Sequence, residues 1–179
     1  GTDYTVVYSA NTNVGTASVT VKGIGAYQGT VVKNFTINAK SVSGLTMTLS
    51  QTSYTYDGTA KKPTVTVKDG SKTLTSGTDY TVSYSNNTNA GTATVTIAGK
   101  GSYTGTVSKT FTISAKSASA LTMTLSQTSY TYDGTAKKPT VTVKDGSKTL
   151  TSGTDYTVSY SNNTAVGTAT VTITGKGNY

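Results

Sequence analysis

The chain has 179 residues, a formal net charge of +8 from 15 basic and 7 acidic residues, and no histidine, cysteine or tryptophan. The absence of cysteine and histidine excludes disulfides and the thiolate or imidazole ligands of most transition-metal sites. Threonine, valine and tyrosine favour strands, while the helix formers glutamate and arginine are absent. The composition therefore predicts an all-β chain without a cofactor.

One sequence recurs along the chain with a fixed spacing of 76 residues. The segment Gly-Thr-Asp-Tyr begins at Gly1, Gly77 and Gly153, and residues 45–88 are identical to residues 121–164. Beyond residue 88 these two copies differ at four pairs of positions: Asn89 and Ala165, Ala90 and Val166, Ala98 and Thr174, Ser102 and Asn178. Fixed-period identity of this kind predicts an array of similar modules.

Two short segments, 38–44 and 114–120, are rich in small polar residues and lack an apolar pattern, so we interpret them as linkers. Residues 45–113 then form one complete module, the middle copy. Residues 1–37, the N-terminal copy, match only the C-terminal half of a module. Residues 121–179, the C-terminal copy, match a module that lacks its last strand.

Alternating apolar residues predict the strands of the middle copy. In chain order these are 45–49, 54–56, 65–67, 80–84, 93–97 and 107–113. Asp69-Gly70 predicts a type I′ hairpin turn within Lys68–Ser71, because glycine and aspartate tolerate positive φ. Six or seven short strands separated by turns are typical of an immunoglobulin-like β-sandwich.

Three sequence blocks of the middle copy carry a family resemblance. They are Tyr-Asp-Gly-Thr-Ala-Lys-Lys-Pro-Thr-Val-Thr-Val at 56–67, Gly-Thr-Asp-Tyr-Thr-Val-Ser-Tyr-Ser-Asn-Asn at 77–87 and Gly-Thr-Ala-Thr-Val-Thr-Ile at 91–97. The chain resembles the bacterial immunoglobulin-like tandem repeats of surface proteins and adhesins, and Tyr56–Gly58 is similar to the MBG/YDG-type repeat. The resemblance implies a secreted protein of the bacterial cell surface or cell wall, with a spacing or adhesive role and no catalytic residues.

Several functions are not expected from these residues. Asp57, Asp69 and Asp79 lie beside turn residues and are interpreted as turn or cap carboxylates, so we expect no enzyme and no metal site. The lysines are dispersed rather than clustered, which does not favour nucleic-acid binding. No apolar run approaches the roughly 18 residues of a membrane span, so we expect no membrane insertion.

Three functions remain open, with neighbouring repeats of the same chain as partners in each. The first is a structural stalk or spacer. The second is a multivalent module that binds a glycan or a host or matrix protein through exposed tyrosines, for which the candidates are Tyr27, Tyr103 and Tyr179. The third is self-association into a fibre by β-strand complementation. Its candidate residues are Gly29, Val31, Phe35 and Ile37.

Overall fold

The computed structural model describes residues 2–179, and these residues form an all-β chain of several small sheets. The only helical elements among them are two single 3₁₀ turns, η1 (Val42–Gly44) and η2 (Ala118–Ala120). The chain divides into two compact units. The first contains the chain up to Ser50 with Pro63–Tyr84 and Val95–Lys109, and the second contains Gln51–Lys62, Ser85–Thr94 and Thr110–Tyr179.

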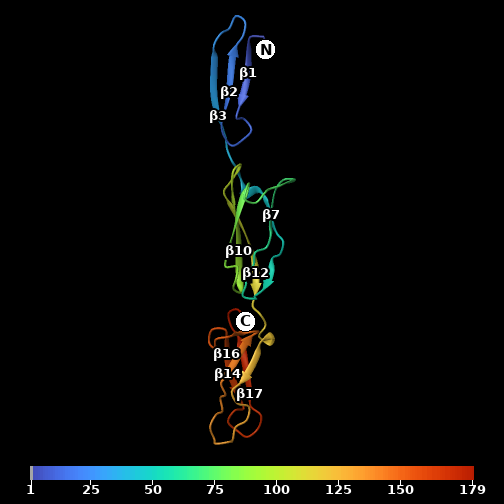
Figure 1. Ribbon diagram of the computed structural model, residues 1–179, viewed down its shortest axis with the longest axis vertical. Helices are drawn as coiled ribbons and strands as arrows, with labels where there is room; N and C mark the ends of the chain where they lie inside the picture. The colour runs from blue at the N-terminus through green and yellow to red at the C-terminus, as the bar shows by residue number, and fades with distance from the viewer. Residues whose placement is uncertain (1) are drawn as a thin grey trace. The chain divides into compact units, whose positions relative to one another are not determined.

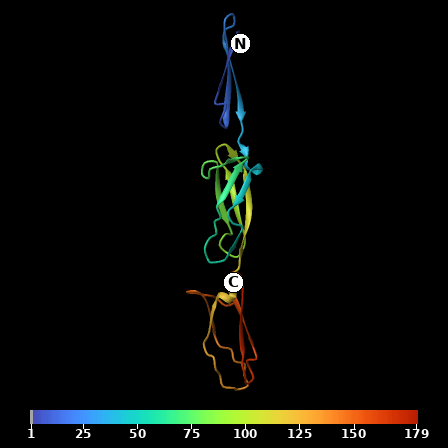
Figure 2. The ribbon, with the colours of Figure 1, turned by 90° about the vertical axis from the view of Figure 1, so that its right-hand side faces the viewer.

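The N-terminal copy is one antiparallel sheet of three strands, β1 (Tyr4–Ser9), β2 (Gly15–Gly23) and β3 (Thr30–Ile37), in the order β1-β2-β3 (Figure 1). Within residues 2–37 Ala17 is the one fully buried side chain. Large apolar side chains of this sheet are exposed, including Tyr4, Val6, Val7, Tyr8, Val31, Val32 and Phe35. The sheet is therefore a single layer, drawn in blue in Figure 2.

The middle copy has two sheets. One contains β5 (Thr46–Leu49), β7 (Val65–Asp69) and β8 (Lys72–Thr73), in the order β5-β7-β8. The other has the order β6-β12-β10-β9, with β6 (Ser53–Thr55), β12 (Thr106–Ser114), β10 (Gly91–Gly99) and β9 (Tyr80–Ser85). Both sheets bury alternate side chains, namely Met47 and Val67 on the first and Tyr80, Ala93, Val95, Ile97, Phe111 and Ile113 on the second. This alternation is the pattern that the sequence predicts.

Tyrosine hydroxyls connect the two sheets of the middle copy. Tyr80 of β9 donates to the Val65 carbonyl at 3.3 Å, and Tyr84 donates to the Pro63 carbonyl at 2.7 Å. Each tyrosine thus packs its ring between the sheets and pairs its hydroxyl with a backbone acceptor near the start of β7. These bonds give the middle copy a sandwich-like arrangement.

The C-terminal copy contains the same elements except those that depend on a last strand. Its strands are β13 (Thr122–Leu125), β14 (Val141–Asp145) and β15 (Lys148–Thr149) in one sheet, and β16 (Tyr156–Ser161) and β17 (Thr170–Gly175) in the other. Residues 129–131 have the sequence of β6 but form no strand. In the middle copy β6 pairs in parallel with β12, and residues 121–179 provide no strand equivalent to β12.

The hairpin at Asp69-Gly70 differs by one residue from the sequence prediction. The register pairs Asp69 with Lys72, so the two-residue loop is Gly70-Ser71. Gly70 has φ 58°, and neither Asp69 nor Ser71 has positive φ. Positive φ at the first loop position alone is the type II′ pattern, in which glycine comes first, so the predicted type I′ turn is wrong.

The segments interpreted as linkers contain secondary structure. β4 (Lys40–Ser41) pairs in parallel with β11 (Tyr103–Thr104), and η1 follows directly, with Val42 fully buried. Ser41 caps η1 by accepting from the Ser43 amide at 3.3 Å, and the second segment repeats this cap at η2. Composition suggested free linkers because these residues are small and polar. The first segment pairs with β11, and the Lys116 amide of the second donates to the Asn178 carbonyl in a distant turn.

Candidate functional site

The aspartates are engaged by turns and by lysines. Asp57 accepts hydrogen bonds from the amide and hydroxyl of Thr59 at 2.8 and 2.6 Å and forms an ion pair with Lys61. The bond from Lys61, followed by those from Thr59, holds the pKa of Asp57 below its ordinary value. Asp79 accepts from the Thr75 amide at 2.8 Å. These contacts agree with the interpretation of Asp57 and Asp79 as turn carboxylates.

Neither a metal-binding cluster nor a membrane-spanning helix occurs among residues 2–179. No group of three or more histidine, cysteine, aspartate or glutamate side chains that could hold a metal ion occurs there. None of the helical turns in the same residues is long and apolar enough to cross a membrane.

Lys40 bonds the first linker to the copy that follows it. Its amide donates to the Ser102 carbonyl at 2.9 Å, and its Nζ forms an ion pair with Asp69 at 2.6 Å. Asp69 also accepts from the Tyr103 hydroxyl at 3.2 Å, and Lys72 Nζ lies 5.8 Å from the centroid of the Tyr103 ring. The bond between Lys40 and Asp69 raises the pKa of the lysine and lowers the pKa of the carboxyl.

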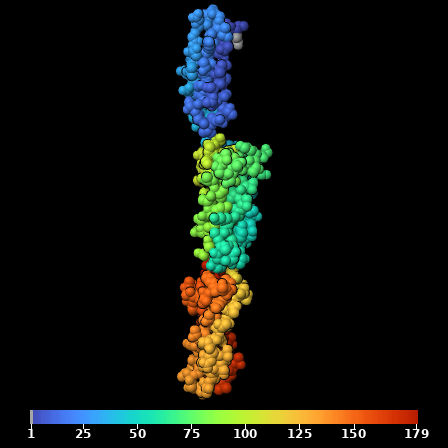
Figure 3. All heavy atoms as spheres, in the orientation of Figure 1, coloured from blue at the N-terminus to red at the C-terminus, as the bar shows by residue number. Residues whose placement is uncertain are grey.

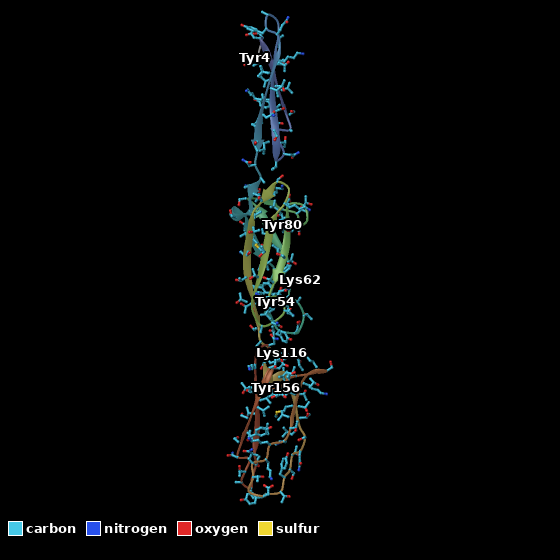
Figure 4. The ribbon with its side chains drawn as sticks, turned by 90° about the vertical axis from the view of Figure 1, so that its left-hand side faces the viewer. Tyr4, Tyr54, Lys62, Tyr80, Lys116 and Tyr156 are labelled. Atoms are coloured by element: carbon cyan, nitrogen blue, oxygen red, sulfur yellow. The ribbon has the colours of Figure 1, made fainter. Side chains whose placement is uncertain are left out.

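Lys116 bonds the second linker in the same way (Figure 4). Its amide donates to the Asn178 carbonyl at 2.9 Å, and its Nζ forms an ion pair with Asp145. Lys148 Nζ lies 5.5 Å from the Tyr179 ring centroid and donates to the Tyr179 hydroxyl at 3.3 Å. Burial raises the pKa of Tyr179, and the bond to Tyr179 raises the pKa of Lys148.

The three candidate ligand-contact tyrosines differ in exposure. Tyr27 is 63% exposed, as the sequence predicts, whereas Tyr103 and Tyr179 are each only 7% exposed. The prediction of exposure is therefore wrong for Tyr103 and Tyr179. A glycine-bounded turn suggested a free ring, but in both cases a lysine from a hairpin about 30 residues away covers the ring, as cation–π geometry favours.

The candidate strand-complementation residues lie on or directly before β3. Val31 is 59% exposed and Phe35 is 41% exposed, while Ile37 is partly buried and Gly29 precedes the strand with φ 96°. β3 pairs with β2 along one edge and is itself the edge of its sheet. The blue side chains in Figure 3 belong to this sheet. The structure thus places these residues on one exposed edge strand.

Sequence reasoning missed a set of contacts between the middle and C-terminal copies, all within the second compact unit. The Asn178 carboxamide accepts from the Ala90 amide at 2.8 Å and donates to the Asn89 side-chain oxygen at 3.2 Å. Tyr179 meets Tyr56 edge to face, with ring centroids 5.5 Å apart. The available signal was that Asn89, Ala90 and Asn178 are positions at which the two copies differ.

Comparisons with known proteins give no relative: no family model, no curated protein and no solved structure matches this chain.

Proposed function

We propose that this chain is a non-catalytic structural segment, a stalk or spacer built of tandem immunoglobulin-like β-sandwich repeats, in a secreted adhesin of the bacterial cell surface. One observation supports the proposal above the others. Each linker is bonded to the copy that follows it by the same pair of contacts, a backbone bond and an ion pair, made by Lys40 and by Lys116.

Bonded linkers matter because a free linker behaves as a flexible coil and does not transmit spacing from one domain to the next. After β3 ends at Ile37, only Asn38 and Ala39 precede β4. After β12 ends at Ser114, only Ala115 precedes the bonded amide of Lys116. Such short unbonded segments limit the rotation of one repeat relative to the next. A spacer requires this restriction in order to hold a defined length.

The sandwich part of the proposal is supported by the middle copy. Its two sheets share a core of alternating side chains, and the hydroxyls of Tyr80 and Tyr84 connect them. Tyr156 and Tyr160 make the equivalent bonds in the C-terminal copy, to Val141 at 3.3 Å and to Pro139 at 2.7 Å. The same inter-sheet bonds in both copies support a common design for the repeats.

Lengthening the chain by whole repeats tests the spacer proposal. Residues 45–120 are inserted once and then twice after residue 120, and the maximum dimension is measured by small-angle X-ray scattering. A spacer gains an equal increment with each insertion. A Lys40→Ala/Lys116→Ala variant of each chain serves as the comparison and is expected to give a smaller increment, because its linkers are freed. Unequal increments, or a ligand that binds the middle copy with micromolar affinity, would reject the proposal.

The exposure of the tyrosines does not favour the multivalent binding alternative. Multivalency gains avidity from equivalent sites in successive copies. Tyr27, Tyr103 and Tyr179 occupy equivalent positions, but only Tyr27 is exposed. A repeated tyrosine site is therefore absent among these three positions.

Self-association by strand complementation is the second candidate function, and a specific observation favours it. The C-terminal copy has a groove whose lining includes Leu125, Tyr130, Tyr132, Tyr160 and Val171, and Tyr132 is 62% exposed. β3 of a second molecule could occupy this groove, because its sequence corresponds to that of β12 in the middle copy. Light scattering coupled to size exclusion tests this function. Growth with concentration, abolished by Phe35→Lys, supports complementation, and a monomer at every concentration rejects it.

A further inference from the structure

Three of the positions that distinguish the copies meet at one place in the structure. Asn89 and Ala90 lie in the turn before β10 of the middle copy, and Asn178 lies four residues after Thr174 in the C-terminal copy. The Asn178 side chain bonds both: its Oδ1 accepts from the Ala90 amide at 2.8 Å and its Nδ2 donates to Asn89 Oδ1 at 3.2 Å. Across residues 45–88 the copies are identical, so the differences concentrate at this contact.

We propose that Asn89, Ala90 and Asn178, here called the junction triad, form a pair-specific lock, in which the turn before β10 of the middle copy bonds only to a following repeat with a matching side chain. The partner of this surface is a repeat that carries asparagine at the position of Asn178. The lock goes beyond the spacer function, because it concerns only contacts inside the chain and holds whether the array spaces, binds or assembles.

The chemistry of the triad requires a carboxamide. Asparagine offers an acceptor oxygen and a donor NH₂ group from one side chain, and both are used here. The middle copy carries Ser102 at the position equivalent to Asn178. A serine hydroxyl has a single oxygen on a shorter side chain, so it does not reach an amide and a carboxamide oxygen together in this geometry.

A pair of tyrosine rings, one from each copy, is also part of the junction. Tyr56 packs edge to face on Tyr179, with an interplanar angle of 79°, and is 7% exposed. Tyr132 is the equivalent of Tyr56, within an identical stretch of sequence, and it is 62% exposed. Val166, the equivalent of the partly buried Ala90, is 84% exposed. The Tyr56 amide also donates to the Ser114 carbonyl at the end of β12, a strand without an equivalent in residues 121–179, so β12 and the following copy both contribute to the burial of Tyr56.

Pair specificity follows from the residues that replace the triad elsewhere. The C-terminal copy presents Ala165 and Val166 where the middle copy presents Asn89 and Ala90. Ala165 has no side-chain oxygen that could accept from an asparagine NH₂ group, and Val166 is two methyl groups larger than Ala90, which is partly buried in the middle copy. A repeat with asparagine at the 178 position thus fits the end of the middle copy and not the end of the C-terminal copy.

The test compares Asn178→Ser with Thr174→Ala in the whole chain. Both variants install the residue of the middle copy, but Thr174 lies outside the triad and is exposed. Asn178→Ser is expected to accelerate hydrogen exchange at the Ala90 amide about fivefold to tenfold, because one partly buried hydrogen bond is lost. It is also expected to weaken the nuclear Overhauser effect between the rings of Tyr56 and Tyr179. Thr174→Ala is expected to change neither.

A second variant, Asn89→Ala/Ala90→Val, tests the pairing from the other side. It installs the C-terminal copy's residues in the middle copy and is expected to weaken the same Overhauser effect. Loss of the effect in both variants supports the lock. Unchanged exchange at Ala90 in Asn178→Ser overturns it, and a full Overhauser effect in the double variant overturns its pair specificity. Folding is verified from exchange in β7 and β14, and the serine is already tolerated at position 102.

Discussion

Replacing Phe111 by alanine separates the contribution of core burial to stability from the contribution of strand pairing. Phe111 is 2% exposed on β12 and meets Tyr54 edge to face, with ring centroids 5.5 Å apart. The alanine variant loses these contacts and leaves a cavity, which costs about 3–5 kcal/mol for a buried phenylalanine. A domain of about 70 residues has a free energy of unfolding of roughly 4–10 kcal/mol, so the variant loses a large part of it.

Phe35→Ala is the matched control, because Phe35 holds the equivalent position of β3 but is 41% exposed. Its expected cost is less than about 1 kcal/mol, as for most surface substitutions. The assay is amide hydrogen exchange with mass spectrometry over a urea series, because it follows the peptides of each copy separately where one two-state transition does not hold. Equal costs at the two positions would show that burial of the ring at Phe111 contributes nothing beyond what the exposed Phe35 contributes.

Two further predictions concern the linker lysine and the turns. Lys40→Gln is expected to raise the pKa of Asp69, because the hydrogen bond from Lys40 is the main cause of its depression. A depressed carboxyl pKa stabilises the fold above the unfolded value and loses that effect as the pH falls through the folded value, so the variant and the parent are expected to converge in stability in acid. Carboxyl nuclear magnetic resonance titration measures this pKa, with Lys62→Gln as the control that leaves it unchanged. Gly99→Ala is expected to destabilise the middle copy more than Gly70→Ala does in urea unfolding. A Cβ at Gly99 would lie 2.6 Å from the Thr104 amide nitrogen, whereas Gly70 has open space and bears only the cost of its positive φ, about 1 kcal/mol. The opposite ranking would show that the backbone at Thr104 yields without cost.

The sequence predicts those parts of the fold in which one face of a strand is buried. Alternation in β5, β7, β9 and β10 has period two, and Ala93, Val95 and Ile97 are buried as that period requires. The loop of the hairpin between β7 and β8 lies one residue later than the sequence predicts, because glycine satisfies either of two turn types. The alternation of apolar residues thus predicts the strands more accurately than it predicts the turns that connect them.

The candidate site was less predictable, because its burial depends on residues distant in sequence. Tyr103 and Tyr179 lie in turns whose own sequence gives no sign of a covering lysine. The junction contacts depend on Asn178 meeting a turn 88 residues earlier. In a sequence with near-identical copies, the few differing positions were the one local sign of a contact between copies.

Corresponding strands of the three copies differ in how far they depend on a distant partner. β1, β2 and β3 keep their antiparallel ladders although no second sheet buries their apolar face. Residues 129–131 lose the strand that the same sequence forms in β6. β6 requires β12 as its partner, and residues 121–179 provide no strand equivalent to β12 with which 129–131 could pair. Antiparallel neighbours are joined by short turns that close at a small entropic cost, whereas β6 pairs in parallel with a strand that begins more than 50 residues later. Distant parallel pairing needs the core around Phe111 already assembled, so β6 is expected to be the first strand lost when that core is weakened.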